Sequence, residues 1–327
     1  MPEPTRRAFR LLSLIDAADV AAWLLAAMLD VAEPAAAGAL ADLAEAQLLD
    51  VVGHDAVGQR RYRMHDLLRL YAGERLTAEE PAPQRAAAVQ RAAAAATSRV
   101  EKASIDLRAD HRARAWLLAE RPTLVALVAN AFAHGHSQLG WRLAADLETF
   151  FEIGSHFDDW QHTQRLALEA ARRAGDRSQE AHVRSRLATA LWLANRWSGA
   201  LDHATRCLPV LRELGQQQEE ARALRTLGRL HHDQGRWAEA DACLAASLEI
   251  LEQLGNDSEL AKTVAQIGIR HRFGDDPDAA ITSLGRAIAL YESVGDRYDA
   301  AHARVQLGCA HRDRGDLDTA LEERLPH

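Results

Sequence analysis

The sequence predicts an all-α fold made mainly of stacked helical hairpins, and the chief observation is a period of forty residues. Glycine, alanine and aliphatic residues recur in phase: Gly175, Gly215, Gly255 and Gly295; Ala181, Ala221, Ala261 and Ala301; Leu187, Leu227, Ile267 and Leu307; Ala200, Ala240, Ala280 and Ala320. A fixed period of this length is typical of repeat proteins, in which each unit buries its apolar face against its neighbours. The composition agrees, because alanine, leucine, arginine and glutamate favour helices and aromatic residues make up only 5% of the chain.

Composition and charge narrow the class of protein. The chain has 327 residues and a formal net charge of −8, which gives no general attraction to nucleic acid. The cysteines Cys207, Cys243 and Cys309 are scattered, as in proteins that keep reduced thiols in a cytosol. The longest apolar stretch near the N-terminus, residues 20–29, is too short to span a bilayer. We therefore expect a cytoplasmic protein with no membrane partner.

Each repeat is expected to be a hairpin of two helices, as residues 215–254 illustrate. Residues 233–235 separate two stretches with helical apolar periodicity, and Gly215 and Gly255 follow the ends of helices. The apolar and small positions are Ala221, Leu224, Leu227, Gly228 and His231, then Ala240, Leu244, Leu248 and Leu251. The expected N-caps that directly follow the glycines are Asp176, Asn256 and Asp296.

These positions resemble the tetratricopeptide repeat. The matching residues are Leu227, Gly228 and His231 in the first helix and Ala240, Leu244 and Ser247 in the second. The unit of forty residues exceeds the usual length of about thirty-four, which implies the longer-helix variety found in large signalling regulators. A fifth, degenerate unit begins at Gly135 and keeps the phase through Leu147, Phe151, Gly154, Phe157 and Leu168. The resemblance implies a superhelix of about five hairpins at residues 135–327 that binds a protein or peptide.

The last repeat is incomplete in sequence. Its second helix should continue well beyond Ala320-Leu321, whereas the sequence ends at His327. Without a polar capping helix, an apolar face is left uncovered. We expect either a piece of a longer array or a face that binds a partner, which could be a second copy of this chain.

Residues 1–77 are expected to form a small winged-helix-like module, because three helices precede a β-hairpin. The expected helices are residues 6–14, 19–29 and 34–46, and the expected strands are residues 48–52 and 61–64, joined by residues 53–58. Residues 78–134 are predicted to be a helical connector. It begins with a linker at residues 78–84 and continues as an alanine-rich helix to Val100.

The segment Met64-His65-Asp66 begins an expected helix with Asp66 as its N-cap. This segment resembles the winged-helix module that follows the nucleotide-binding (NB-ARC) domain of STAND-type ATPases, where a Met-His-Asp motif serves as a sensor. The resemblance implies a histidine that touches the phosphate of bound ADP. A downstream run also resembles actinobacterial regulators of antibiotic-synthesis genes: Trp116-Leu117, Glu120-Arg121-Pro122 and Leu124. The resemblance covers nearly the whole chain but only the C-terminal half of such a regulator.

A nucleotide cofactor is not expected in this chain, because no G-x-x-x-x-G-K-[ST] phosphate loop is present. ADP or ATP would be bound only with a separate nucleotide-binding domain. Two interpretations of His65 stay open: a latent nucleotide sensor and a structural histidine at a strand–helix junction.

Catalysis and metal binding are not expected either. His231, His271 and His311 share one repeat position, but packed helices lie about 8–10 Å apart and zinc–nitrogen bonds are near 2 Å. The sequence contains no HExxH, GxSxG or CxxC motif. We interpret the three histidines as packing residues and the chain as a non-enzyme.

Direct DNA binding is disfavoured by the charge of the expected recognition helix, residues 34–46. It contains Asp42 and Glu45 and neither lysine nor arginine, so it would repel the phosphate backbone.

The first helix of each hairpin lines the concave groove in the family that the repeats resemble, and here that face carries basic residues. Arg222, Arg225 and Arg229 share a helix face, where exposed arginines could grip carboxylates or phosphates bidentately. The other groove candidates are His232, Lys262, Arg272, Arg312 and Trp192. The alternative interpretation is a solvated arginine face balanced by Glu219 and Glu220.

Three functions remain as hypotheses. The first is a non-catalytic interaction and sensor module of a signal-transduction ATPase regulator, whose partner presents acidic groups to the groove. The second is a stand-alone scaffold with no link to nucleotide switching. The third, a DNA-binding winged-helix regulator, predicts salt-dependent binding to duplex DNA.

Overall fold

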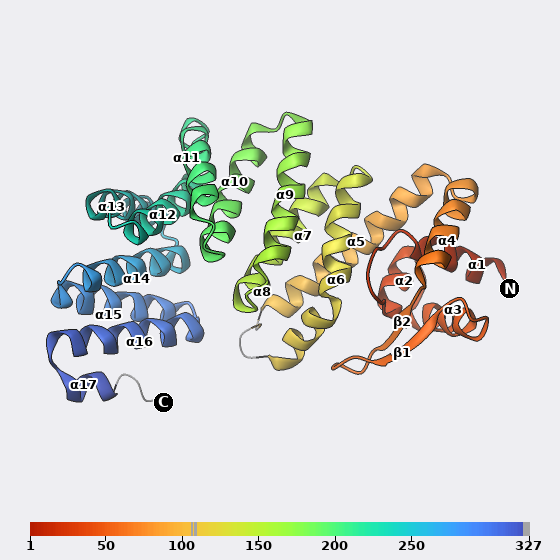
Figure 1. Ribbon diagram of the computed structural model, residues 1–327, viewed down its shortest axis with the longest axis horizontal. Coiled ribbons are helices and arrows are strands. Elements are labelled where there is room, and N and C mark those ends of the chain that lie inside the picture. The colour runs from red at the N-terminus through yellow and green to blue at the C-terminus, as the bar shows by residue number, and fades with distance from the viewer. Residues whose placement is uncertain (106, 108–109, 323–327) are drawn as a thin grey trace. The chain divides into compact units, whose positions relative to one another are not determined.

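The computed structural model describes residues 1–105, 107 and 110–322 (Figure 1). It is predominantly helical, and the described part contains one sheet of two short strands. The chain divides into two compact units, Met1–Ala174 and Gly175–His327. The prediction of an all-α fold with repeated helical hairpins is confirmed.

The first unit begins with three helices and an antiparallel hairpin. Helix α1 spans Glu3–Leu12, α2 Ala22–Leu29 and α3 Glu33–Glu45, and strands β1 and β2 span Asp50–His54 and Arg60–Arg63. Tyr62 of β2 also pairs with Val20, which ties the hairpin to the start of α2. The core of this module is apolar and includes Leu11, Trp23, Leu24, Leu40 and Leu43. This order of elements is the one a winged helix requires, and the assignment to that class stays a prediction.

Two expectations about the next segment are wrong. Helix α4 spans Asp66–Glu79; its N-cap is His65, without a capping side-chain hydrogen bond, so Asp66 is the first helical residue and not the cap. Asp66 still places a negative charge in the first turn, where the helix dipole favours it. The expected linker is also largely helical, because α5 starts at Ala82 with Pro83 in its first turn, where proline needs no hydrogen-bonded N–H.

The remaining helices of the first unit are α5 (Ala82–Ser104), α6 (His111–Ala133), α7 (Ser137–Asp146), α8 (Glu148–Ile153) and α9 (Phe157–Ala174). Helices α5, α6 and α7 pack against one another, and α9 packs against α6, α7 and α8. The degenerate repeat that starts at Gly135 is therefore part of the first compact unit, whereas the predicted array begins with it.

A buried polar contact joins the hairpin to the connector. The Glu120 carboxylate on α6 pairs with the Arg61 guanidinium on β2 and accepts a hydrogen bond of 2.9 Å from the Trp23 indole. Arg61 also donates to Asp19 at 2.7 Å. Glu120 is fully buried, and this burial raises the pKa of its carboxyl group against the opposing effect of Arg61. The expected module and connector thus share one polar core.

The second unit consists of hairpins whose first members we call the A helices. They are α10 (Arg177–Leu193), α12 (Gln217–Asp233), α14 (Asp257–Phe273) and α16 (Arg297–Arg314). The second members, the B helices, are α11 (Trp197–Glu213), α13 (Trp237–Leu254), α15 (Pro277–Ser293) and α17 (Leu317–Glu322). The predicted uncovered end of the array falls partly on residues 323–327, which lie outside the described residues.

The predicted starts of the A helices are confirmed at three positions. The side chains of Asp176, Asn256 and Asp296 each accept a hydrogen bond of 3.0–3.2 Å from a backbone N–H in the first turn. The preceding glycines have φ between 63° and 75°, a left-handed conformation that glycine adopts without a steric penalty. Glycine and cap together therefore fix each junction between repeats.

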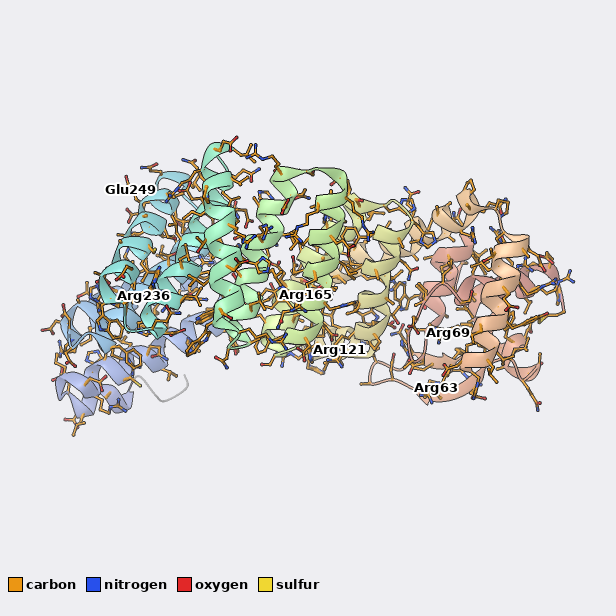
Figure 2. All side chains as sticks on the ribbon, turned by 45° about the horizontal axis from the view of Figure 1, so that its top comes forward. Arg63, Arg69, Arg121, Arg165, Arg236 and Glu249 are labelled. Atoms are coloured by element: carbon orange, nitrogen blue, oxygen red, sulfur yellow. The ribbon has the colours of Figure 1, made fainter. Side chains whose placement is uncertain are left out.

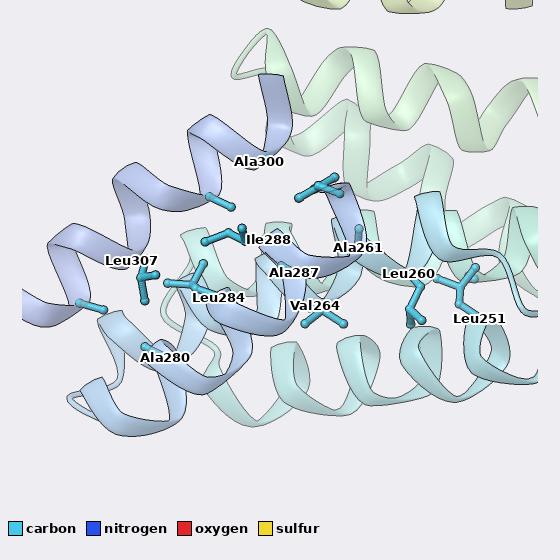
Figure 3. Packing of buried hydrophobic residues seen from close by; sticks show 14 residues of the cluster. Leu251, Leu260, Ala261, Val264, Ala280, Leu284, Ala287, Ile288, Ala300 and Leu307 are labelled. Atoms are coloured by element: carbon cyan, nitrogen blue, oxygen red, sulfur yellow. The ribbon is translucent and has the colours of Figure 1, made fainter. Parts of the chain in front are cut away.

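One apolar core extends through successive hairpins (Figure 3). Leu251 comes from one repeat, Leu260 and Leu284 from the next, and Leu307 from the one after. Because each repeat completes the core of its neighbour, no single hairpin buries its apolar face alone.

Close contact within the hairpins depends on glycine, and this gives a first prediction. A Cβ atom at Gly268 would lie 2.6 Å from Leu284 Cγ, so Gly268→Ala should destabilise the unit by about 1–3 kcal/mol. A Cβ atom added at Gly285, on the packing partner α15, would have no other atom within 4 Å. Gly285→Ala should therefore stabilise the unit by up to about 1 kcal/mol, because alanine favours a helix more than glycine does. Urea unfolding measures both variants, and effects of equal sign would contradict the packing described here.

Membrane-spanning potential is confined to one bent pair of helices. Among the described residues, no single helix is long and apolar enough to cross a bilayer. The pair α2 and α3, bent by 109°, is long and apolar enough only when the two helices are counted together.

Candidate functional site

Ion pairs that share a carboxylate join consecutive A helices. Glu259 on α14 binds Arg225 of the preceding A helix at 2.7 Å and Lys262 of its own helix at 2.9 Å. Burial alone would raise the pKa of the Glu259 carboxyl group, but the positive charges of Arg225, Lys262 and Arg222 outweigh it and hold this pKa well below its usual range. Two cations thus share one carboxylate that remains ionised.

A second shared carboxylate lies at the other end of these helices. Asp313 on α16 is 2.8 Å from Arg312 and 3.9 Å from Arg272 of the preceding A helix. The Arg272 guanidinium also lies 4.5 Å from the ring centre of Phe273. Again two cations share one carboxylate. At the Glu259 end of the α14–α16 face, Asp299 of α16 adds a second carboxylate, because it occupies the position of Glu259 on its own helix and acts on the same buried Tyr291 as Arg225 does.

The middle of the same face is apolar. Ala265 and Ile269 on α14 are half-buried, as is Cys309 on α16, and Val305 is 45% exposed. Lys262 and Arg272 are ten residues apart on one helix, so the two charged ends are separated by about 15 Å. The face therefore has a small apolar centre between an end that carries Lys262 and an end that carries Arg272 and Arg312.

Aromatic and basic side chains meet near the C-terminal ends of α10 and α12. The Arg229 guanidinium lies 4.6 Å from the ring centre of Trp192 and donates a 3.0 Å hydrogen bond to Gln266. The Trp192 indole donates to Asp233 at 2.7 Å. The His232 ring is 5.3 Å from that of Phe273. These contacts connect consecutive A helices and leave the aromatic side chains in part accessible.

The placement of the predicted groove residues is mixed. Arg222, Arg225 and Arg229 all lie on α12, as the spacing indicates, but Arg225 is only 6% exposed. Its expected role as an exposed, ligand-gripping arginine is therefore corrected to a structural ion pair with Glu259. The groove role of the other candidates stays a prediction.

Sequence reasoning named Glu219 but missed Glu259 and Asp313, which also organise the face. The signal was available, because one position near the start of each A helix is acidic or polar: Gln179, Glu219, Glu259 and Asp299. Glu219 repeats the arrangement, with Arg186 at 3.3 Å and Arg222 at 3.5 Å.

The Met64-His65-Asp66 segment presents two of its three residues to solvent. Met64 is buried, whereas His65 and Asp66 are exposed where β2 leads into α4. The helix continues with exposed apolar residues: Leu67 is 72%, Leu70 68% and Tyr71 53% exposed. Apolar side chains at this spacing form one accessible helix face, which is typical of a surface that packs against another protein part.

The histidines and cysteines of the described part of the chain are mostly packed within the repeats. Its histidines, cysteines and carboxylates form no group of three or more that could hold a metal ion. His311 is buried and His231 and His271 are half-buried, in keeping with a packing role. Burial raises the pKa of the Cys207 thiol to about 12, so this thiol stays protonated at neutral pH.

Comparison with known proteins gives a family match and two relatives. Residues 219–293 match the family model of the tetratricopeptide repeat. The regulatory protein AfsR of Streptomyces griseus is 30% identical over 234 residues, which cover 64% of this chain and 23% of the relative. AfsR of Streptomyces coelicolor is 28% identical over 227 residues, or 62% of this chain and 22% of the relative. The matched region thus spans less than a quarter of either relative's length.

One solved structure supports the fold, and the fold alone. A Rap protein complexed with competence and sporulation factor aligns with a TM-score of 0.53 at 14% identity, covering 74% of this chain and 75% of that one. A STAND protein with a tetratricopeptide repeat sensor from Pyrococcus horikoshii gives a TM-score of 0.45 at 12% identity, covering 99% of this chain and 56% of that one. Residues 219–293 are thus tetratricopeptide repeats in sequence, and the second unit has the corresponding fold of stacked helical hairpins.

Proposed function

We propose that the chain is a non-catalytic interaction and sensor module of a cytoplasmic regulator, and that its A helices bind an extended peptide segment with acidic groups. Tetratricopeptide repeats are binding scaffolds, and both curated relatives are regulatory proteins. The proposal of an acidic ligand rests on one observation. The carboxylates of Glu259 and Asp313 are each shared by two basic side chains.

The geometry suggests the spacing of the ligand. An extended chain advances about 3.3 Å per residue and alternate side chains share a face, so two carboxylates four residues apart lie on one face and span about 13 Å. Together with the reach of the two glutamate side chains, this length matches the separation of the two charged ends, and the residues between the carboxylates would lie over Ala265, Ile269 and Val305. The fitting ligand is therefore acidic at both ends and small or aliphatic between them.

A fluorescence anisotropy titration tests this proposal with a defined probe. The probe is a labelled peptide with two glutamates separated by three alanine or leucine residues, and a comparison peptide has glutamines in their place. We expect the glutamate peptide to bind and the double variant Lys262→Gln/Arg312→Gln to weaken binding about tenfold, because each lost contact is a partly exposed charge-assisted hydrogen bond.

The matched control is Arg206→Gln/Arg286→Gln, which removes the same charge from exposed positions on the B helices α11 and α15. This control should bind the probe as the unchanged protein does. Equal affinity for the glutamate and glutamine peptides would overturn the proposed ligand class.

The regulator part of the proposal is supported by the exposed start of α4. His65 and Asp66 stand beside the apolar face formed by Leu67, Leu70 and Tyr71, an arrangement suited to packing against a nucleotide-binding domain with the histidine at its edge. Such a domain, added as a separate protein together with ADP, should bind this chain. The variant Leu67→Ser/Leu70→Ser should lose that binding while the acidic probe still binds the repeats, so the two parts of the proposal can fail separately.

A further inference from the structure

A cavity of about 380 Å³ lies between α6 and α9 of the first unit. Its floor is a second apolar face of α6, formed by Pro122, Val125, Ala126 and Ala129 at helical spacing, whereas the opposite face of α6 is buried in the core. A volume of this size is within the range of small-molecule sites. The floor alone would accept any compact apolar group, so the rim decides the ligand.

The rim carries two carboxylates with unused acceptor capacity. The Asp16 side chain is 99% exposed and lies 3.8 Å from Arg69. The two terminal nitrogens of Arg69 donate to backbone carbonyls. Asp159 lies 3.5 Å from Arg121, whose terminal nitrogen donates at 2.8 Å to His156. Figure 2 shows Arg69 and Arg121 on their helices. Within the described residues, neither carboxylate accepts a side-chain hydrogen bond.

The neutral residues of the rim also favour a hydrogen-bond donor as ligand. Asn130 donates its amide N–H to the Ala126 carbonyl at 2.9 Å, which leaves its side-chain oxygen as an acceptor. An anion would have to compete with His156 and Asp159 for Arg121. Arg121 and His162 also line the cavity, and Arg121 already contacts Asp159 and His156. A cation therefore meets two carboxylates and an amide oxygen above an apolar floor, with Arg121 held by those partners.

We propose that this cavity binds a small amphiphilic cation, with its apolar body on the α6 floor and its ammonium or guanidinium group between Asp16, Asp159 and the Asn130 oxygen. This site is independent of the A helices, because all of its residues belong to the first unit.

Three probes that differ only in their head group test the charge preference on the full chain. They are 4-phenylbutylamine, 4-phenylbutanol and 4-phenylbutanoate, and their binding is measured by saturation-transfer NMR titration. We expect the amine to bind in the millimolar range, the alcohol at least threefold more weakly, and the carboxylate not at all. Comparable binding of all three probes, or preference for the carboxylate, overturns the proposal.

Two variants locate the site. Ala126→Phe fills the cavity and should abolish binding of the amine, while Asp16→Asn removes one fully exposed charge and should weaken it about three- to fivefold without affecting the fold. The control Glu45→Gln removes an exposed charge on α3, outside the cavity lining, and should leave binding unchanged. Amine binding that survives both cavity variants overturns the proposal.

Discussion

Replacing Glu259 with glutamine is expected to destabilise the repeat unit by about 3–5 kcal/mol, because it leaves the buried Arg225 guanidinium without a carboxylate. The remaining contacts of Arg225 are a 3.3 Å hydrogen bond to the Glu259 backbone carbonyl and a 3.4 Å one to Thr263. Neither neutral partner offsets a buried charge. Urea unfolding followed by circular dichroism measures the effect, and hydrogen exchange shows whether it falls on α12 and α14.

The chain offers a closely matched control for this variant. Glu252 and Arg286 also join neighbouring repeats, at 2.6 Å and with the same separation of 34 residues, but both side chains are nearly half exposed. Solvent screens such a pair, so Glu252→Gln should cost no more than about 1 kcal/mol. Equal losses in the two variants would show that burial of the Glu259 pair contributes nothing.

The same carboxylate predicts the direction of acid sensitivity. Its pKa is lowered in the folded chain, so the unfolded chain takes up a proton first as the pH falls below the ordinary value of 4.5. The stabilisation from Glu259 is therefore present above pH 4.5 and is lost progressively below it, toward the lowered pKa. Glu259→Gln should flatten the stability profile in that acidic window, which urea unfolding at a series of pH values measures.

The second large effect is expected at Glu120. Glu120→Ala removes the carboxylate that pairs with Arg61 and accepts the Trp23 indole hydrogen bond, and it opens a gap in a buried site. We expect a loss of about 3–5 kcal/mol in the first unit. Tryptophan fluorescence and hydrogen exchange in urea would report it, with reduced protection in β2 and α6.

The control for this prediction is Glu101→Ala on α5. Glu101 pairs with Arg142, but both side chains are exposed, at 43% and 60%. Its loss should cost no more than about 1 kcal/mol. If Glu120→Ala were as mild as this control, the hairpin and the connector would not depend on their shared polar contact.

The local parts of the fold were predictable from the sequence because they depend on neighbouring residues. A cap such as Asp176 or Asn256 lies three residues from the N–H that it binds, so glycine followed by a cap indicates a helix start. The same rule misplaced Asp66 by one residue, since His65 already occupies the cap position.

Contacts between segments that are distant in sequence were not predictable in this way. The spacing placed Arg225 on the right helix face, but its burial depends on Glu259, 34 residues later in the chain. Glu120 likewise meets Arg61 across 59 residues. A pattern of apolar residues within one helix contains no information on which charge the adjacent helix presents.

The ion pair between Arg225 and Glu259 has a consequence for how the repeats respond to stress. In the next repeat, Ala265 occupies the position of Arg225, so the junction of α14 with α16 cannot form the equivalent pair from that position. In an array whose units contact only their neighbours, an uneven set of junctions makes opening begin at the weakest one. Fraying should then start at α16, and the α12–α14 pair should stay folded longest.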